Sequence, residues 1–140
     1  MENKPFWETA YSDLKVSAFS KGPTADVEDH FRIFPSNAAV LDVGCGEGRN
    51  SVFMAKLGNH VDAFDISAAG IEKARQIAEM EKVSIRFFVC DLADFVFKKP
   101  YDIILCWELL YHTEGTFRDS HPGGIHHEHA YERIIARKPR

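Results

Sequence analysis

The chain has 140 residues and a mass of 15.9 kDa, enough for one domain with one hydrophobic core. Its formal net charge of -4, with the two signs interspersed, argues against a basic surface for nucleic acid or anionic membrane. We therefore expect a small-molecule substrate, and neither nucleic acid nor a membrane as partner. The sequence holds no apolar run near the roughly 20 residues of a membrane span, and its start lacks the layout of a signal peptide, which predicts a cytoplasmic protein.

The three cysteines, Cys45, Cys90 and Cys106, form no CxxC pair. An odd number of cysteines without a secretion signal argues against a disulfide framework. We expect reduced thiols that pack as small hydrophobes, with a catalytic thiol as the alternative.

Residues 24–34 are the first predicted element, a helix that covers the sheet or closes a pocket. Thr24 can cap this helix, and acidic residues follow in its first turns. Its apolar face would carry Val27, Phe31 and Phe34.

From residue 38 onward, strand-like and helix-like runs alternate, which is typical of an α/β fold with βαβ units and a parallel sheet. Strands are expected at 38–43, 60–65, 83–90 and 101–107. Helices are expected at 49–58 and 68–82, with Gly58 ending the first and Ser67 capping the second.

The stretch "VLDVGCGEGRNS" (40–51) places glycines at alternate positions after the first strand, so its backbone can approach a ligand closely. The spacing G-x-G-x-G differs from the G-x-G-x-x-G of dinucleotide sites. Asp42 and Glu47 would also repel a pyrophosphate, by roughly 4 kcal/mol per charge pair at 4 Å and an effective dielectric of 20. The loop therefore suits a cationic ligand without phosphate, such as S-adenosylmethionine, and a nicotinamide-dependent oxidoreductase stays an alternative.

Carboxylates stand where the other strands end, and ligands of open α/β sheets bind beyond these ends. Asp65 would accept hydrogen bonds from both ribose hydroxyls, and a group at Asp91 could meet the adenine edge. The structural alternative is that the glycines form a tight turn and the aspartates cap helices.

Four stretches, "VLDVGCGEGRNS", "DAFDIS", "VCDLADF" and "YDIILCWELLYH", resemble motifs I to IV of class I S-adenosylmethionine-dependent methyltransferases, in order and at that family's spacing. The wording "GCGEGRNS" and "DLADF" is most similar to the tellurite-resistance methyltransferases. The resemblance implies a Rossmann-like fold, a mostly parallel sheet with helices on both faces and a terminal antiparallel hairpin. It further implies methyl transfer to a small molecule, such as a tellurium or selenium oxyanion or a thiol, by direct displacement without an assigned catalytic base.

The resemblance also implies a cofactor site, in which Asp65 would hold the ribose and Ile66 would lie against the adenine. For Trp107 the alternative is a core aromatic, and for Trp7 and Tyr11, which resemble flap residues, it is plain packing. The implied set is Asp42, Gly44, Cys45, Gly46, Gly48, Arg49, Asn50, Asp65, Ile66, Asp91, Leu92, Cys106, Trp107, Trp7 and Tyr11.

The resemblance divides the chain into N-terminal cap helices (1–37), a cofactor-binding βαβ core (38–112) and a C-terminal hairpin (113–140). The last part is shorter than in the family and has its turn at "HPGG", so we expect an incomplete fold that lacks the fifth strand. The edge of strand four would then be exposed. We predict that 130–136 either docks against it or exchanges between two chains in a homodimer, and that methyl transfer is weak although cofactor binds. A cofactor-binding module without catalysis is therefore the alternative function.

Histidines gather in the last part of the chain, where His127 and His129 would share one face of a strand. A zinc site with His121 or Glu114 is the alternative to solvated or substrate-facing histidines, and we expect no metal. In relatives a histidine of this hairpin would face the substrate, so His121 and His127 are candidate substrate residues.

Overall fold

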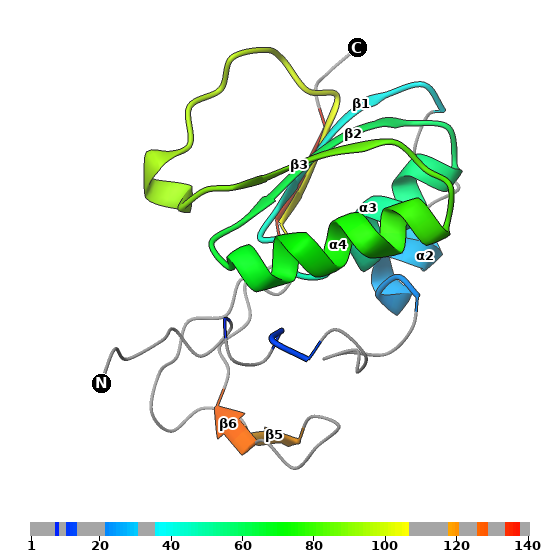
Figure 1. Ribbon diagram of the computed structural model, residues 1–140. Helices are drawn as coiled ribbons and strands as arrows, with labels where there is room; N and C mark the ends of the chain where they lie inside the picture. Colours follow the sequence, from blue (N-terminus) through cyan, green and yellow to red (C-terminus); the bar gives the residue numbers. More distant parts are fainter. Residues whose placement is uncertain are drawn as a thin grey trace.

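The computed structural model describes residues 8, 11–13, 22–30, 36–106, 118–120, 126–128 and 134–137, the last three ranges by their backbone. A five-stranded sheet with the order β3-β2-β1-β4-β7 forms its centre (Figure 1). The first four strands in the chain are mutually parallel, and the last is antiparallel to β4. The strands are β1 (Ala39–Val43), β2 (His60–Asp65), β3 (Ile85–Val89), β4 (Ile103–Cys106) and β7 (Ile134–Arg137).

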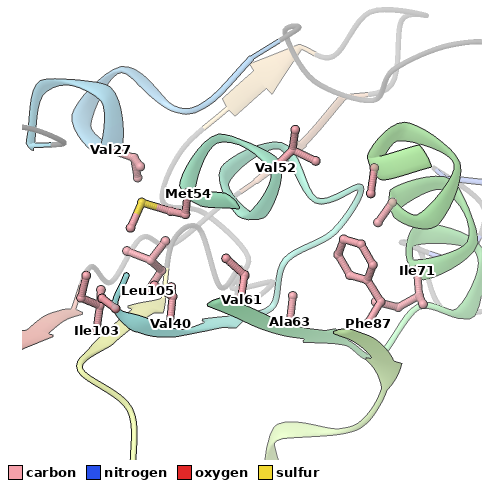
Figure 2. Packing of buried hydrophobic residues seen from close by; sticks show 13 residues of the cluster. Val27, Val40, Val52, Met54, Val61, Ala63, Ile71, Phe87, Ile103 and Leu105 are labelled. Carbon is pink, nitrogen blue, oxygen red and sulfur yellow. The ribbon is translucent and has the colours of Figure 1, made fainter. Parts of the chain in front are cut away.

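One face of the sheet is covered by α2 (Ala25–His30), α3 (Arg49–Lys56) and α4 (Ala68–Met80) (Figure 1). Side chains alternate between the two faces of a strand, so every second residue of each strand points to these helices. Figure 2 shows the resulting core, in which residues of all three helices meet the sheet. Its labelled members are Val27, Val40, Val52, Met54, Val61, Ala63, Ile71, Phe87, Ile103 and Leu105.

The opposite face carries Leu41, Val43 and Phe64, which the connection between β3 and β4 covers. This connection contains the short 3-10 helix η2 (Leu92–Asp94), and its Phe95 ring stacks on Phe64 with centroids 4.5 Å apart. The described α-helices all lie on the first face, and the expectation of helices on both faces depends on residues 107–117, which lie outside the described residues.

A buried carboxylate fastens the β3 to β4 connection to the sheet. Asp62 accepts hydrogen bonds from the Tyr101 hydroxyl at 2.6 Å and from the Arg86 guanidinium at 2.8 and 3.0 Å, and Lys99 Nζ lies 2.8 Å away. Burial opposes the charge of Asp62, but these donors outweigh burial and lower its pKa. Partial burial and the bond to this carboxylate raise the pKa of the half-buried Tyr101 to about 12.

The predicted order of βαβ units is confirmed, with shorter elements. The second helix ends at Met80 because Glu81 caps it and Lys82 has a left-handed φ of 56°. Gly58 follows the first helix with a φ of 87°, as its position predicts. In the predicted helix 24–34, α2 ends at His30, and Phe31 and Phe34 lie outside the described residues.

The last part of the chain differs from the single hairpin that the sequence predicts. β5 (Arg118–Ser120) and β6 (His126–Glu128) pair antiparallel around the predicted turn, but they form a separate two-stranded sheet. Of these three strands, β7 pairs with β4 on the side away from β1, which confirms the predicted docking of this segment against strand four. The reason is composition, since "IIAR" brings apolar residues to a buried sheet and "RDS" and "HHE" do not. In the residues that the structure describes, no helix is long and apolar enough to cross a membrane.

Candidate functional site

The loop between β1 and α3 has left-handed backbone at all three glycines, with φ of 68° at Gly44, 55° at Gly46 and 80° at Gly48. A Cβ at Gly48 would lie 3.0 Å from Ala74 Cβ and 3.2 Å from the Phe87 ring, so this glycine lets α3 start close to α4 and β3. A Cβ at Gly46 would lie 2.5 Å from Tyr11 Oη. The groups nearest to an added Cβ at these two glycines are protein side chains, and the predicted approach of a ligand to the loop stays a prediction.

Asp65 joins the glycine loop to the end of β2. Its Oδ2 accepts a hydrogen bond from Gly46 N at 2.8 Å, and its Oδ1 accepts one from Ser67 N at 2.9 Å. Burial raises the pKa of Asp65, and these N–H donors offset part of the rise. The Ile66 N–H also lowers the pKa of Asp65, and a carboxylate has about four lone pairs, so the side chain can still accept a hydrogen bond from a ligand hydroxyl.

Asp42 lies at the corresponding end of β1 and is only 2% exposed. The Ser51 hydroxyl donates a 2.6 Å hydrogen bond to its Oδ2. Burial raises the pKa of Asp42 to about 7, the Ser51 bond opposes the rise, and the charge of Asp65 adds to it. With two carboxylates beside the loop, a further negative charge is unfavourable there and a positive charge on a ligand is favourable.

A buried ion pair joins the glycine loop to α4. Lys73 Nζ on α4 lies 3.3 Å from Glu47 Oε2, and each side chain is 4% exposed. The same Nζ donates a 3.0 Å hydrogen bond to the carbonyl oxygen of Asp13. The sequence pattern predicts Glu47 only as a charge that repels phosphate, and the position of Lys73 in a helix does not indicate its partner.

Tyr11, in the described residues 11–13 of the N-terminal segment, lies against Gly46 of this loop. Tyr11 is 4% exposed, and burial raises the pKa of its hydroxyl well above the usual value, with the charges of Asp65 and Glu47 adding to the effect. Glu8 accepts hydrogen bonds from Ser67 Oγ at 2.7 Å and Ala69 N at 3.1 Å, at the start of α4. No pattern in the sequence predicts this role of Glu8.

Two exposed apolar side chains follow the ends of β2 and β3, Ile66 at 55% and Leu92 at 48%. Large apolar groups exposed beside buried carboxylates can contact a ligand ring. The Asp91 carboxylate accepts a 2.9 Å hydrogen bond from Ala93 N and so caps η2, as the structural alternative expects.

Several other predicted residues have structural contacts. The Asn50 side chain points to α2, where its Oδ1 accepts a 2.9 Å hydrogen bond from Thr24 N. Arg49 begins α3, and Cys45 N donates to the Phe64 carbonyl at 3.0 Å. Burial raises the pKa of the Cys45 thiol well above its usual value, so it is not an activated nucleophile.

Cys106 packs against the apolar cluster on the second face of the sheet. Trp7, Trp107 and His121 lie outside the described residues, and His127 is described by its backbone in β6. Among the residues that the structure describes, the sulfur, nitrogen and carboxylate groups form no cluster of three that could hold a metal ion.

Comparison with known proteins places this geometry in a family. Residues 40–120 match the family described as "Methyltransferase domain". The chain belongs to this family of S-adenosylmethionine-dependent methyltransferases. The family decides against the nicotinamide-dependent alternative.

Individual relatives extend beyond this chain. The chain is 33% identical over 80 residues to the ubiquinone biosynthesis O-methyltransferase of Rickettsia canadensis, an alignment that spans 57% of this chain and 34% of that protein. TehB of Haemophilus influenzae is similar at a TM-score of 0.55 and 30% identity, over 64% of this chain and 30% of TehB. Magnesium protoporphyrin IX methyltransferase of Synechocystis, solved with bound S-adenosylhomocysteine, gives 0.57 and 29%, over 64% and 42% of the two chains. The chain thus spans about a third of the length of the curated relatives it matches.

Proposed function

We propose that this chain binds S-adenosylmethionine at the carboxyl ends of β1, β2 and β3 and transfers its methyl group to a small-molecule acceptor. The observation that carries the proposal is the pair of carboxylates, Asp42 and Asp65, on either side of the glycine loop. The negative charges of the two carboxylates repel a phosphate ligand and attract a cationic one. S-adenosylmethionine has a sulfonium and an amino group and no phosphate.

The residues around the loop fit the parts of this cofactor. Asp65 can still accept a hydrogen bond from a ribose hydroxyl, and Ile66 and Leu92 offer exposed apolar surface to the adenine. Asp42 and the loop would take the sulfonium side. We further propose that the other residues of the predicted set contact the cofactor, the described ones through their backbone. Trp7 and Trp107, which lie outside the described residues, stay in the proposed set.

When bound, S-adenosylmethionine supplies a methyl group activated by its positive sulfur. The residues of the chain would orient the reacting groups and exclude water, and the position of Tyr11 over Gly46 supports such a role for this side chain. Soft nucleophiles need little help from a base, so the proposal assigns no catalytic acid or base.

The acceptor is a finer proposal. The motif wording supports a tellurium or selenium oxyanion or a thiol, and the curated relatives, named as O-methyltransferases of ubiquinone biosynthesis, support an oxygen acceptor. His121 and His127 remain proposed substrate residues, and a cytoplasmic location and a homodimer remain proposals as well.

The second candidate is a cofactor-binding module with reduced or absent catalysis. It is favoured by the direct pairing of β7 with β4, at the sheet edge where the resemblance implies a fifth strand. Both candidates require cofactor binding, and they differ in turnover.

Calorimetric titration with S-adenosylmethionine, S-adenosylhomocysteine and NAD tests the binding. We expect the first two to bind and NAD not to bind; binding of NAD alone would contradict the proposal. Methylation assays with selenite, a thiol and a phenol then separate the enzyme, which turns over one of them, from the module, which turns over none.

A further inference from the structure

The ammonium of Lys73 is buried between two parts of the candidate site. It pairs with Glu47 in the glycine loop at 3.3 Å and donates to the Asp13 carbonyl at 3.0 Å. A buried ammonium or carboxylate without a partner is costly, so both groups favour the arrangement in which they meet. The loop and the N-terminal segment are therefore held by one side chain of α4.

The N-terminal segment contacts α4 at two further places. Glu8 binds the first turn of the helix through Ala69 N, and the Tyr11 ring lies where a Cβ on Gly70 would come within 3.0 Å of it. Tyr11 also lies over Gly46 of the loop. Lys73 thus contacts both the glycine loop and residues 11–13, whose Tyr11 lies over Gly46 of the loop.

We propose that Lys73 is a positioning residue that joins the glycine loop to residues 11–13, so that the two receive the cofactor as one unit. The proposal rests on the function proposed above. Lys73 acts through Glu47 and the Asp13 carbonyl, and it makes no contact with the ligand itself. Its removal should loosen both partners while the rest of α4 stays packed on the sheet.

Hydrogen exchange of the ligand-free protein tests the junction without relying on cofactor. Lys73→Met keeps the apolar stem and removes the charge, and we expect about tenfold faster exchange at residues 11–13 and 44–48. Adding Glu47→Gln removes the buried negative charge that the Lys73 ammonium balances in the wild-type chain, so exchange at 44–48 should recover while 11–13 stays fast. This double variant also serves if the single variant does not fold.

Lys56→Met is the matched control, because Lys56 pairs with Glu81 on the surface, at the other end of α3 and away from the loop. It should change neither segment. A purely structural lysine would instead raise exchange along all of α4, and that result, or unchanged exchange at 11–13 in both Lys73 variants, would overturn the proposal.

Titration with S-adenosylhomocysteine adds the functional readout, for which we expect about tenfold weaker binding by Lys73→Met and no change for Lys56→Met. Unchanged affinity in Lys73→Met would also overturn the positioning role. A wild-type chain that does not bind S-adenosylhomocysteine would defeat the proposed function, and the exchange result would still report on the junction separately.

Discussion

Replacing Asp42 by Asn should stabilise the protein at alkaline pH, although Asp42 lies at the centre of the candidate site. Asp42 is buried and accepts a hydrogen bond from the Ser51 hydroxyl. An asparagine keeps an oxygen for this hydroxyl and has nearly the same shape. It removes the charge, which burial makes unfavourable.

The magnitude follows from the pKa of Asp42, which rises from 3.8 to about 7 on folding. At about 1.4 kcal/mol per pH unit, this rise corresponds to about 4 kcal/mol. The folded pKa is the higher one, so the stabilising effect of the protonated carboxyl is complete below pH 3.8 and is lost as the pH rises to 7. Asp42→Asn should therefore gain up to about 4 kcal/mol at pH 8 and about 2 kcal/mol at pH 5.

Urea unfolding of both proteins at pH 5 and pH 8 measures these differences. Asp62→Asn is a matched control, because Asp62 is also a buried strand aspartate but has its pKa lowered by Arg86, Lys99 and Tyr101, which outweigh burial. That variant should lose stability at pH 8, and lose less as the pH falls. The reasoning fails if Asp42→Asn is no more stable than wild type at pH 8, or if its gain is the same at both pH values.

Three further predictions concern the ligand and the loop. Asp65→Ala should weaken S-adenosylhomocysteine binding by at least about tenfold in calorimetry, since it removes charge-assisted acceptors; unchanged affinity in a folded variant would refute the ribose assignment. Gly46→Ala should lower the melting temperature, and should lower it less in a Tyr11→Phe background, because its Cβ would lie 2.5 Å from Tyr11 Oη; equal losses in both backgrounds would contradict this. Binding of S-adenosylmethionine should tighten between pH 6 and pH 8, as Asp42 ionises; a flat calorimetric profile would count against a cation beside Asp42.

The parts of the fold that depend on local pattern could be predicted from the sequence. Alternating apolar runs and helical spacing predicted β1 to β4 and α2 to α4. Gly58 predicted the end of α3, and its backbone is left-handed in the structure. The destination of the last residues was harder. The sequence predicted that 130–136 would meet β4, but the separation of β5 and β6 from the sheet depends on which of three short strands gains most from burial.

The positions of candidate site residues could be predicted only where the type of residue and its place in the chain together indicate a single role. Asp65 and the glycines could be located because a strand end and a loop fix their positions. Lys73 and Glu8 could not, since a lysine in a helix and a glutamate near a terminus are ordinarily solvated. Their partners come from distant parts of the chain, and only the fold brings them together.

Asp42 and Asp62 show why burial alone does not identify a site. Both aspartates interrupt apolar strands, on opposite faces of neighbouring β1 and β2. Asp62 meets two cations and a phenol, so its charge stabilises the ligand-free protein and fastens a connection. Asp42 is buried and meets one hydroxyl, and the charge of Asp65 adds to the effect of burial while Arg49 opposes it, so the negative charge of Asp42 is unfavourable in the ligand-free protein. By linkage, a ligand that favours the ionised carboxylate is bound more tightly when the carboxylate is ionised. In the proposed site, the unfavourable negative charge of Asp42 therefore supports a cationic ligand, whereas Asp62, whose charge is already balanced, supports none.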